Sequence, residues 1–101
     1  MALIAIHPGE QLQEELVALS MSAAELARQI EVPANRISQI LKADRDISAD
    51  TAIRLGHFFG TSAQFWLNLQ SIYDLRIAER QIGRFIKALP TLKSIHAHAP
   101  V

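Results

Sequence analysis

The stretch SAAELARQIEVPANRISQILK, residues 22–42, decides the fold of this chain, because it predicts two short helices joined by a tight turn. Ser22 and Glu25 have capping-box spacing, in which each side chain satisfies a free backbone N–H where a helix begins. Pro33 rules out one continuous helix, since proline lacks an N–H and clashes with the preceding turn. The second helix is therefore predicted to run from about Ala34 to Lys42.

These two helices predict a helix-turn-helix, in which the outer face of the second helix is polar. Ala27 falls where the helices cross closely, and only a small side chain fits there. Apolar residues that fix the crossing angle surround it: Leu26, Ile30, Val32, Ile37 and Ile40. An ordinary helical hairpin with a solvated polar face is the alternative. This register of apolar residues around so short a turn favours DNA binding.

Helical spacing of apolar residues predicts three further helices outside this stretch. Their expected ranges are about 8–19, about 49–59, and 63 to 79 or beyond. Residues 81–88 are expected to form another short helix before Pro90, and the tail after it is expected to be loosely ordered. The sequence thus predicts one all-α domain over residues 1–101, with the helix-turn-helix at about 22–42.

Polar side chains on the second helix of the motif are candidates for reading bases. Asn35 and Gln39 lie four residues apart and share one helix face, and either amide can pair in bidentate fashion with adenine in the major groove. Arg36 can pair with guanine or a phosphate. Ala34 can touch a thymine methyl, and Ser38 can donate to a base or to the backbone.

A second group of polar residues suits the DNA backbone. Basic side chains and helix N-termini fix the register of a protein on DNA without reading bases. The predicted phosphate contacts are Ser22, Arg28, Lys42, Arg45 and Arg54. A solvated charge or a surface ion pair is the alternative for each basic residue, and Arg45 has Asp44 and Asp46 beside it.

The charge distribution says more than the net charge, which is zero with ten basic and ten acidic residues. A zero balance argues mildly against a nucleic-acid binder, because phosphate contacts usually leave a basic footprint. However, every charged residue from Met1 to Ala27 is a glutamate, and every one from Arg80 onward is positive. An acidic surface is thus expected to lie opposite a basic one. In the alternative interpretation, the basic C-terminal region binds an acidic protein partner.

The composition also excludes several classes of site. The chain has no cysteine, so it forms no disulfide and no thiolate metal site. No histidine has an acidic residue at a spacing that would support catalysis, so we expect no enzyme. His96 and His98 are too few ligands for a closed metal site, so we expect no metal and no cofactor. No apolar stretch approaches the roughly 18 residues that cross a bilayer, and Met1 to Ile6 lacks a signal peptide's basic region. We expect a cytoplasmic protein without membrane contact.

Apolar residues beyond the minimal helix-turn-helix unit predict a homodimer. Such proteins bind two half-sites about one DNA turn apart, and the excess apolar surface lies over about residues 62–90. The expected dimer interface consists of Phe65, Trp66, Leu69, Tyr73, Ile82, Phe85 and Ile86. Base stacking on these aromatics is the alternative, but aromatics at helical spacing among leucines more often form a core or a dimer seam.

Five short motifs resemble those of HigA-type antitoxins. They are HPGE at 7–10, NRIS at 35–38, ADTA at 49–52, FFGTS at 58–62 and FWLNLQ at 65–70. The resemblance covers about residues 7–80 and implies a five-helix, lambda repressor-like helix-turn-helix domain with a C-terminal helical extension. It also implies a homodimer that binds a palindromic operator, neutralises a HigB-like toxin of the ribosome-dependent messenger-RNA endonuclease class and represses the operon encoding both.

Two positions depart from this family's usual pattern. The turn after the second helix often has glycine where this chain has Glu31, and the loop after the third often has Asn-Gly where it has Ala43-Asp44. A residue other than glycine in the left-handed conformation costs about 1 kcal/mol. A stand-alone regulator without a toxin, or a protein-interaction module with weak DNA binding, remains an alternative function.

Overall fold

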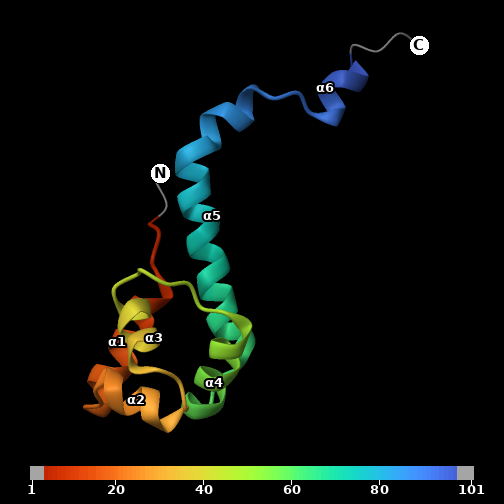
Figure 1. Ribbon diagram of the computed structural model, residues 1–101. Coiled ribbons are helices and arrows are strands. Elements are labelled where there is room, and N and C mark those ends of the chain that lie inside the picture. The colour runs from red at the N-terminus through yellow and green to blue at the C-terminus, as the bar shows by residue number, and fades with distance from the viewer. Residues whose placement is uncertain (1–3, 98–101) are drawn as a thin grey trace.

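The computed structural model describes residues 4–97, and all regular secondary structure in this range is helical. The helices are α1 (Pro8–Leu19), α2 (Ala23–Gln29), α3 (Ala34–Leu41), α4 (Ala49–Phe59), α5 (Ala63–Ala88) and α6 (Leu92–Ala97). The first four helices and the start of α5 pack together, and the rest of α5 extends away from them (Figure 1). The predicted all-α helix-turn-helix fold is confirmed.

Side-chain caps explain where these helices begin. Ser22, Ser48 and Ser62 each accept a hydrogen bond from the backbone N–H three residues later, over 3.1, 3.3 and 3.0 Å. Glu31, where the family often has glycine, adopts the left-handed conformation with φ of 57°. Ala43, the first residue of the pair where the family often has Asn-Gly, does so with φ of 61°. The turns of the motif are therefore kept without glycine, at a local cost in backbone strain.

The core lies among α1 to α4 and the first turns of α5. Its buried residues are Leu12, Leu16, Leu26, Ala27, Ile30, Ile37, Ile40, Ile47, Ala52, Leu55 and Trp66. Ala27 is only 2% exposed, as expected where two helices cross closely, and Val32 packs against the core from the turn. The predicted wedge between the two helices of the motif is thus in place.

Trp66 corrects one predicted interface residue. Its side chain is 0% exposed, packs near Phe59 and Phe65, and donates from Nε1 to the Thr61 hydroxyl oxygen over 3.0 Å. The indole is the largest fully buried side chain of the protomer, so it cannot contact a second copy in this conformation. Trp66 is a core residue that joins α5 to the end of α4.

The C-terminal region differs from the sequence prediction in two ways. Residues 81–88 are not a separate helix but the end of α5, because Gly83 costs a helix only about 1 kcal/mol and no proline lies between Ala63 and Ala88. The tail also forms α6, where the Thr91 and Ser94 hydroxyls each accept from the other's backbone N–H over 3.0 Å. This reciprocal cap was the missed signal. Over residues 4–97, no helix is both long and apolar enough to cross a membrane.

The HPGE motif forms the junction between α1 and the rest of the domain. His7 is 4% exposed, and its Nδ1 accepts from the Gly9 N–H over 2.9 Å, which caps α1. The imidazole ring meets the edge of Tyr73 on α5 at a centroid distance of 4.9 Å. Its Nε2 is buried and has no hydrogen-bond partner within the described part of the chain. The cap requires an unprotonated Nδ1, so His7 must be neutral.

We expect the free energy of unfolding to fall as pH drops below about 6.5. Burial lowers the pKa of His7 from its usual value of 6.5, against the opposing effects of the Asp46, Asp74 and Glu10 carboxylates and of the Arg45 backbone. Because the folded-state pKa lies below the unfolded one, the neutral cap contributes fully above pH 6.5 and is lost as pH falls. The slope contributed by this residue should not exceed about 1.4 kcal/mol per pH unit.

Denaturant unfolding from pH 7.5 to 5 measures this dependence. The matched variant is His7→Asn, because asparagine also caps helices but does not titrate. The variant should show a flatter profile in this window. Identical profiles for the two proteins would show that His7 does not control the acid sensitivity.

Candidate DNA-binding interface

The outer face of α3 carries the polar residues predicted to read bases. Pro33 precedes the helix in an extended conformation, with φ of −60° and ψ of 142°, and Ile37 and Ile40 anchor its inner face in the core. Asn35 is exposed and Gln39 is half-buried on the face away from that core. The structure therefore brings these two amides to one accessible surface, as the four-residue spacing predicts.

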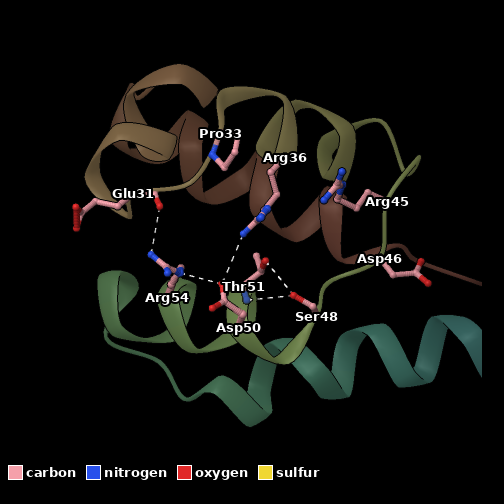
Figure 2. A pocket seen from close by; sticks show the side chains of 9 residues that line it. All are labelled: Glu31, Pro33, Arg36, Arg45, Asp46, Ser48, Asp50, Thr51 and Arg54. Atoms are coloured by element: carbon pink, nitrogen blue, oxygen red, sulfur yellow. Dashed lines mark hydrogen bonds and ion pairs between the residues drawn. The ribbon is translucent and has the colours of Figure 1, made fainter.

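Arg36 points to a different side of α3. Its Nη1 lies 3.6 Å from Asp50 Oδ1 at the start of α4, and Figure 2 shows the side chain directed toward α4. The same carboxylate accepts from Arg54 Nε over 2.9 Å. Asp50 therefore joins one arginine of α3 to one arginine of α4, and Arg36 does not lie with Asn35 and Gln39.

Arg54 has an internal role that the sequence did not reveal. Its Nη1 donates to the carbonyl oxygens of Ile30 and Glu31 over 2.7 and 3.3 Å. These carbonyls end α2, where the helix leaves acceptors without partners. Arg54 thus stabilises the turn of the motif. Its predicted phosphate contact stays a prediction, because the guanidinium already binds these two carbonyl oxygens.

Other predicted contact residues differ in how free their polar groups are. Arg28, Lys42 and Arg45 are exposed, so all three can reach a phosphate. The Ser22 hydroxyl caps α2, and the Ser38 hydroxyl donates to the carbonyl oxygen of Asn35 over 3.2 Å. Arg45 Nε also donates to Gln39 Oε1 over 2.8 Å, which links the loop after α3 to its outer face.

A polar hollow lies between the turn of the motif, α3 and α4 (Figure 2). It is lined by Glu31, Pro33, Arg36, Arg45, Asp46, Ser48, Asp50, Thr51 and Arg54. Three arginines and three acidic residues line the hollow, and Asp50 pairs with both Arg36 and Arg54. The positive charges of Arg36 and Arg54 are therefore partly neutralised by one acidic residue of the same protein.

Gln70 is a polar residue of the fold that sequence reasoning missed. It is 6% exposed on α5, and its Oε1 accepts from the Ile47 N–H over 2.8 Å. Its Nε2 donates to Asp46 Oδ1 over 3.2 Å and to Asp74 Oδ1 over 3.0 Å. Gln70 thereby ties the loop between α3 and α4 to α5. In the sequence, Gln70 was marked only as the last residue of the FWLNLQ motif, which does not indicate its partners.

The predicted dimer interface residues do not all share one surface. Phe65, Ile82, Phe85 and Ile86 are exposed, and Leu69 and Tyr73 are half-buried against their own protomer. The exposed residues on the second half of α5 continue an apolar stripe, which consists of Leu75, Ile82, Phe85, Ile86 and Leu89. Arg84 lies on the opposite side of the helix at 100° per residue, whereas Lys87 borders the groove that Leu75, Ile82 and Ile86 line.

No metal site is apparent where the structure can be described. Residues 4–97 contain no group of three or more His, Cys, Asp or Glu side chains placed to hold a metal ion. His96 lies on α6, whereas His98 lies outside the described residues.

The geometry of the motif agrees with known proteins. A family model described as helix-turn-helix matches residues 12–66, which include α2, α3 and α4. The chain belongs to the helix-turn-helix family. Virulence-associated protein I of Dichelobacter nodosus is 51% identical over 77 residues, which cover 75% of this chain and 71% of that protein.

Solved structures of HigA-family antitoxins are similar to this helix-turn-helix chain. An antidote protein of the HigA family from Coxiella burnetii is 49% identical with a TM-score of 0.86, covering 88% of this chain and 98% of that one. Pseudomonas aeruginosa antitoxin HigA, solved with the higBA promoter, is 47% identical with a TM-score of 0.84 and coverage of 88% and 99%. The resemblance to HigA-type antitoxins is confirmed.

Proposed function

We propose that this chain is a DNA-binding antitoxin that acts as a homodimer, represses its own toxin-antitoxin operon and neutralises a HigB-like toxin. The observation that carries the DNA-binding part is the exposed outer face of α3, where Asn35 and Gln39 lie together on a helix fixed by the core. Solved structures support DNA binding, since antitoxin GraA was solved in complex with its operator. GraA is 39% identical to this chain with a TM-score of 0.78, and the match covers 91% of this chain and 95% of GraA.

Selection from a random-sequence DNA duplex library tests this proposal without knowledge of the operator. The wild-type chain should enrich a palindromic motif, and binding to it should weaken steeply with salt because phosphate contacts release counterions. Enrichment of no motif, together with a flat salt response, would contradict DNA binding and favour the protein-interaction module.

We expect Asn35→Ala to weaken binding to the selected motif by about 1 to 3 kcal/mol and to relax one base position. The matched control is Lys42→Ala, which removes an exposed charge from the end of the same helix. The lysine variant should weaken binding to all sequences alike, as loss of a phosphate contact does. Equal losses on the motif and on random DNA for both variants would remove the base-reading assignment.

The dimer part of the proposal rests on the apolar stripe of α5. Phe85 is 65% exposed, and Leu75, Ile82 and Ile86 are each about half exposed. Contiguous exposed apolar patches of this kind mark interaction sites in soluble proteins. A second copy suits this stripe, because a helix-turn-helix protein needs two copies to fill a palindromic site.

Phe85→Glu should convert the protein from a dimer to a monomer in sedimentation or light-scattering measurements, since it places a charge in an apolar seam. Affinity for the palindromic motif should fall at least about tenfold, which corresponds to 1.4 kcal/mol. Arg84→Gln is the control, because it changes the net charge equally on the opposite side of α5. A dimeric Phe85→Glu protein would place the interface elsewhere.

The antitoxin part of the proposal needs a separate test, because it rests on the family alone. A toxin-like reading frame directly beside this gene should encode a protein that arrests growth when expressed alone. Co-expression of this chain should relieve the arrest, and the two proteins should purify together. A gene without such a neighbour would identify a stand-alone regulator.

A further inference from the structure

A hydrogen bond joins the loop after α3 to the base-reading face of that helix. Arg45 Nε donates to Gln39 Oε1 over 2.8 Å. We propose that Arg45 is a positioning residue, which orients the Gln39 amide and so sets the base preference at one position of the DNA site. The inference rests on the proposed function, because it requires α3 to lie in the major groove.

The chemistry of the two side chains fixes the orientation of the amide. An arginine side chain has only N–H donors, whereas a glutamine amide has an acceptor oxygen and a donor nitrogen. The atom of Gln39 that faces Arg45 must therefore be the oxygen. An unattached amide can rotate to present either edge, but this bond excludes the flipped orientation. It also orders the side chain before DNA arrives, which reduces the entropy lost on binding.

A fixed amide orientation distinguishes the two purines. Adenine offers an N6 donor and an N7 acceptor in the major groove, whereas guanine offers two acceptors, O6 and N7. Gln39 Oε1 has a second lone pair, so it can accept from adenine N6 while it holds Arg45, and Nε2 can donate to N7. The flipped amide could donate to guanine O6 instead. Arg45 thus favours adenine by excluding that alternative.

The loop that carries Arg45 is anchored on both sides. Before it, the Asp44 N–H donates to the Gln39 carbonyl oxygen over 2.9 Å, and Ala43 makes the left-handed turn that allows this. After it, the Ile47 N–H donates to Gln70 Oε1 over 2.8 Å. The guanidinium therefore extends from a fixed backbone, as a positioning residue requires.

Charge and orientation can be separated at this residue. The bond to Gln39 uses Nε, so the two Nη groups of Arg45 can still contact a phosphate. Arg45→Lys keeps the charge but places a methylene group, Cε, where Arg45 has the Nε donor that holds the amide. Arg45→Ala loses both. A phosphate contact alone would be largely retained by lysine, whereas a positioning role would not.

The experiment uses the full chain and the motif that it selects from a random duplex library. Affinities are measured for that motif and for its three substitutions at the base pair that Gln39→Ala relaxes. We expect wild type to prefer adenine there by roughly 5- to 150-fold. Arg45→Ala and Arg45→Lys should both lose most of this preference. The double variant Gln39→Ala/Arg45→Ala should lose no more of it than Gln39→Ala does.

The controls separate this inference from loss of folding and from loss of DNA binding. Lys42→Ala should keep the full preference at this base pair, and thermal melts should match wild type because the Arg45 side chain is exposed. Wild-type preference in both Arg45 variants would overturn the positioning role and leave the proposed function standing. Failure of the wild-type chain to select any motif would overturn both.

Discussion

Gly9→Ala is expected to lower the free energy of unfolding by about 3 kcal/mol, through overpacking between two helices. A Cβ at Gly9 would overlap the carbonyl oxygen of Ile40, and would lie 3.0 Å from the Ile40 carbonyl carbon and 3.1 Å from His7 Nδ1. The atoms of Ile40 are backbone near the end of α3, so no side-chain rotation relieves the clash. The first turn of α1 must therefore move away from α3.

Thermal unfolding measures this effect. A loss of 3 kcal/mol should lower the melting temperature by roughly 10 to 20 °C for a domain of this size. The matched control is Gly83→Ala on α5, where a new Cβ would meet no atom within 4 Å. That variant should gain up to about 1 kcal/mol, because alanine is the better helix former. Similar melting temperatures for both variants would show that Gly9 is not needed for close packing.

The HPGE motif shows how a resemblance can identify residues without explaining them. In the sequence, His7 and Gly9 were notable only as part of a motif that resembles the family, and Pro8 marked only the expected start of the first helix. The structure shows that the imidazole caps α1 and that the glycine lets α1 approach the carbonyl of Ile40. Neither reason is local in sequence, since Ile40 is 31 residues away, and helical periodicity describes only one element at a time.

The motif itself was predictable because its determinants are local. Capping at Ser22, the break at Pro33 and the small residue at Ala27 each act within a few residues, and the structure places all three as expected. The extent of α5 was not predictable in the same way, because no strong signal ends or continues a helix near Gly83.

Long-range polar contacts explain why parts of the candidate site escaped prediction. Arg54 was assigned to phosphate from its charge, but its bonds to Ile30 and Glu31 span more than twenty residues. Trp66 was assigned to a dimer seam, but the core was large enough to enclose it. Charge and hydrophobicity show that a residue needs a partner, and only the fold shows which partner it has.

Gln70→Leu is expected to lower the free energy of unfolding by up to about 3 kcal/mol, because it leaves the buried Ile47 N–H without a partner. The substitution nearly conserves volume, but leucine cannot accept from the Ile47 N–H, which belongs to a residue only 4% exposed. It also cannot donate to Asp46 and Asp74, whose carboxylates then lose bonds of 3.2 and 3.0 Å. The loop before α4 should therefore loosen from α5.

Gln64→Leu provides the matched control, because it is the same substitution on the same helix. The Gln64 amide bonds only an exposed partner, Asn68, over 2.8 Å, so its loss should change stability by no more than about 0.5 kcal/mol. Hydrogen exchange gives a second readout, since the Ile47 amide should exchange faster in Gln70→Leu and not in Gln64→Leu. If both variants unfold alike and Ile47 stays protected, water replaces the glutamine, and the loop that carries Arg45 is held by its bonds to the end of α3 instead.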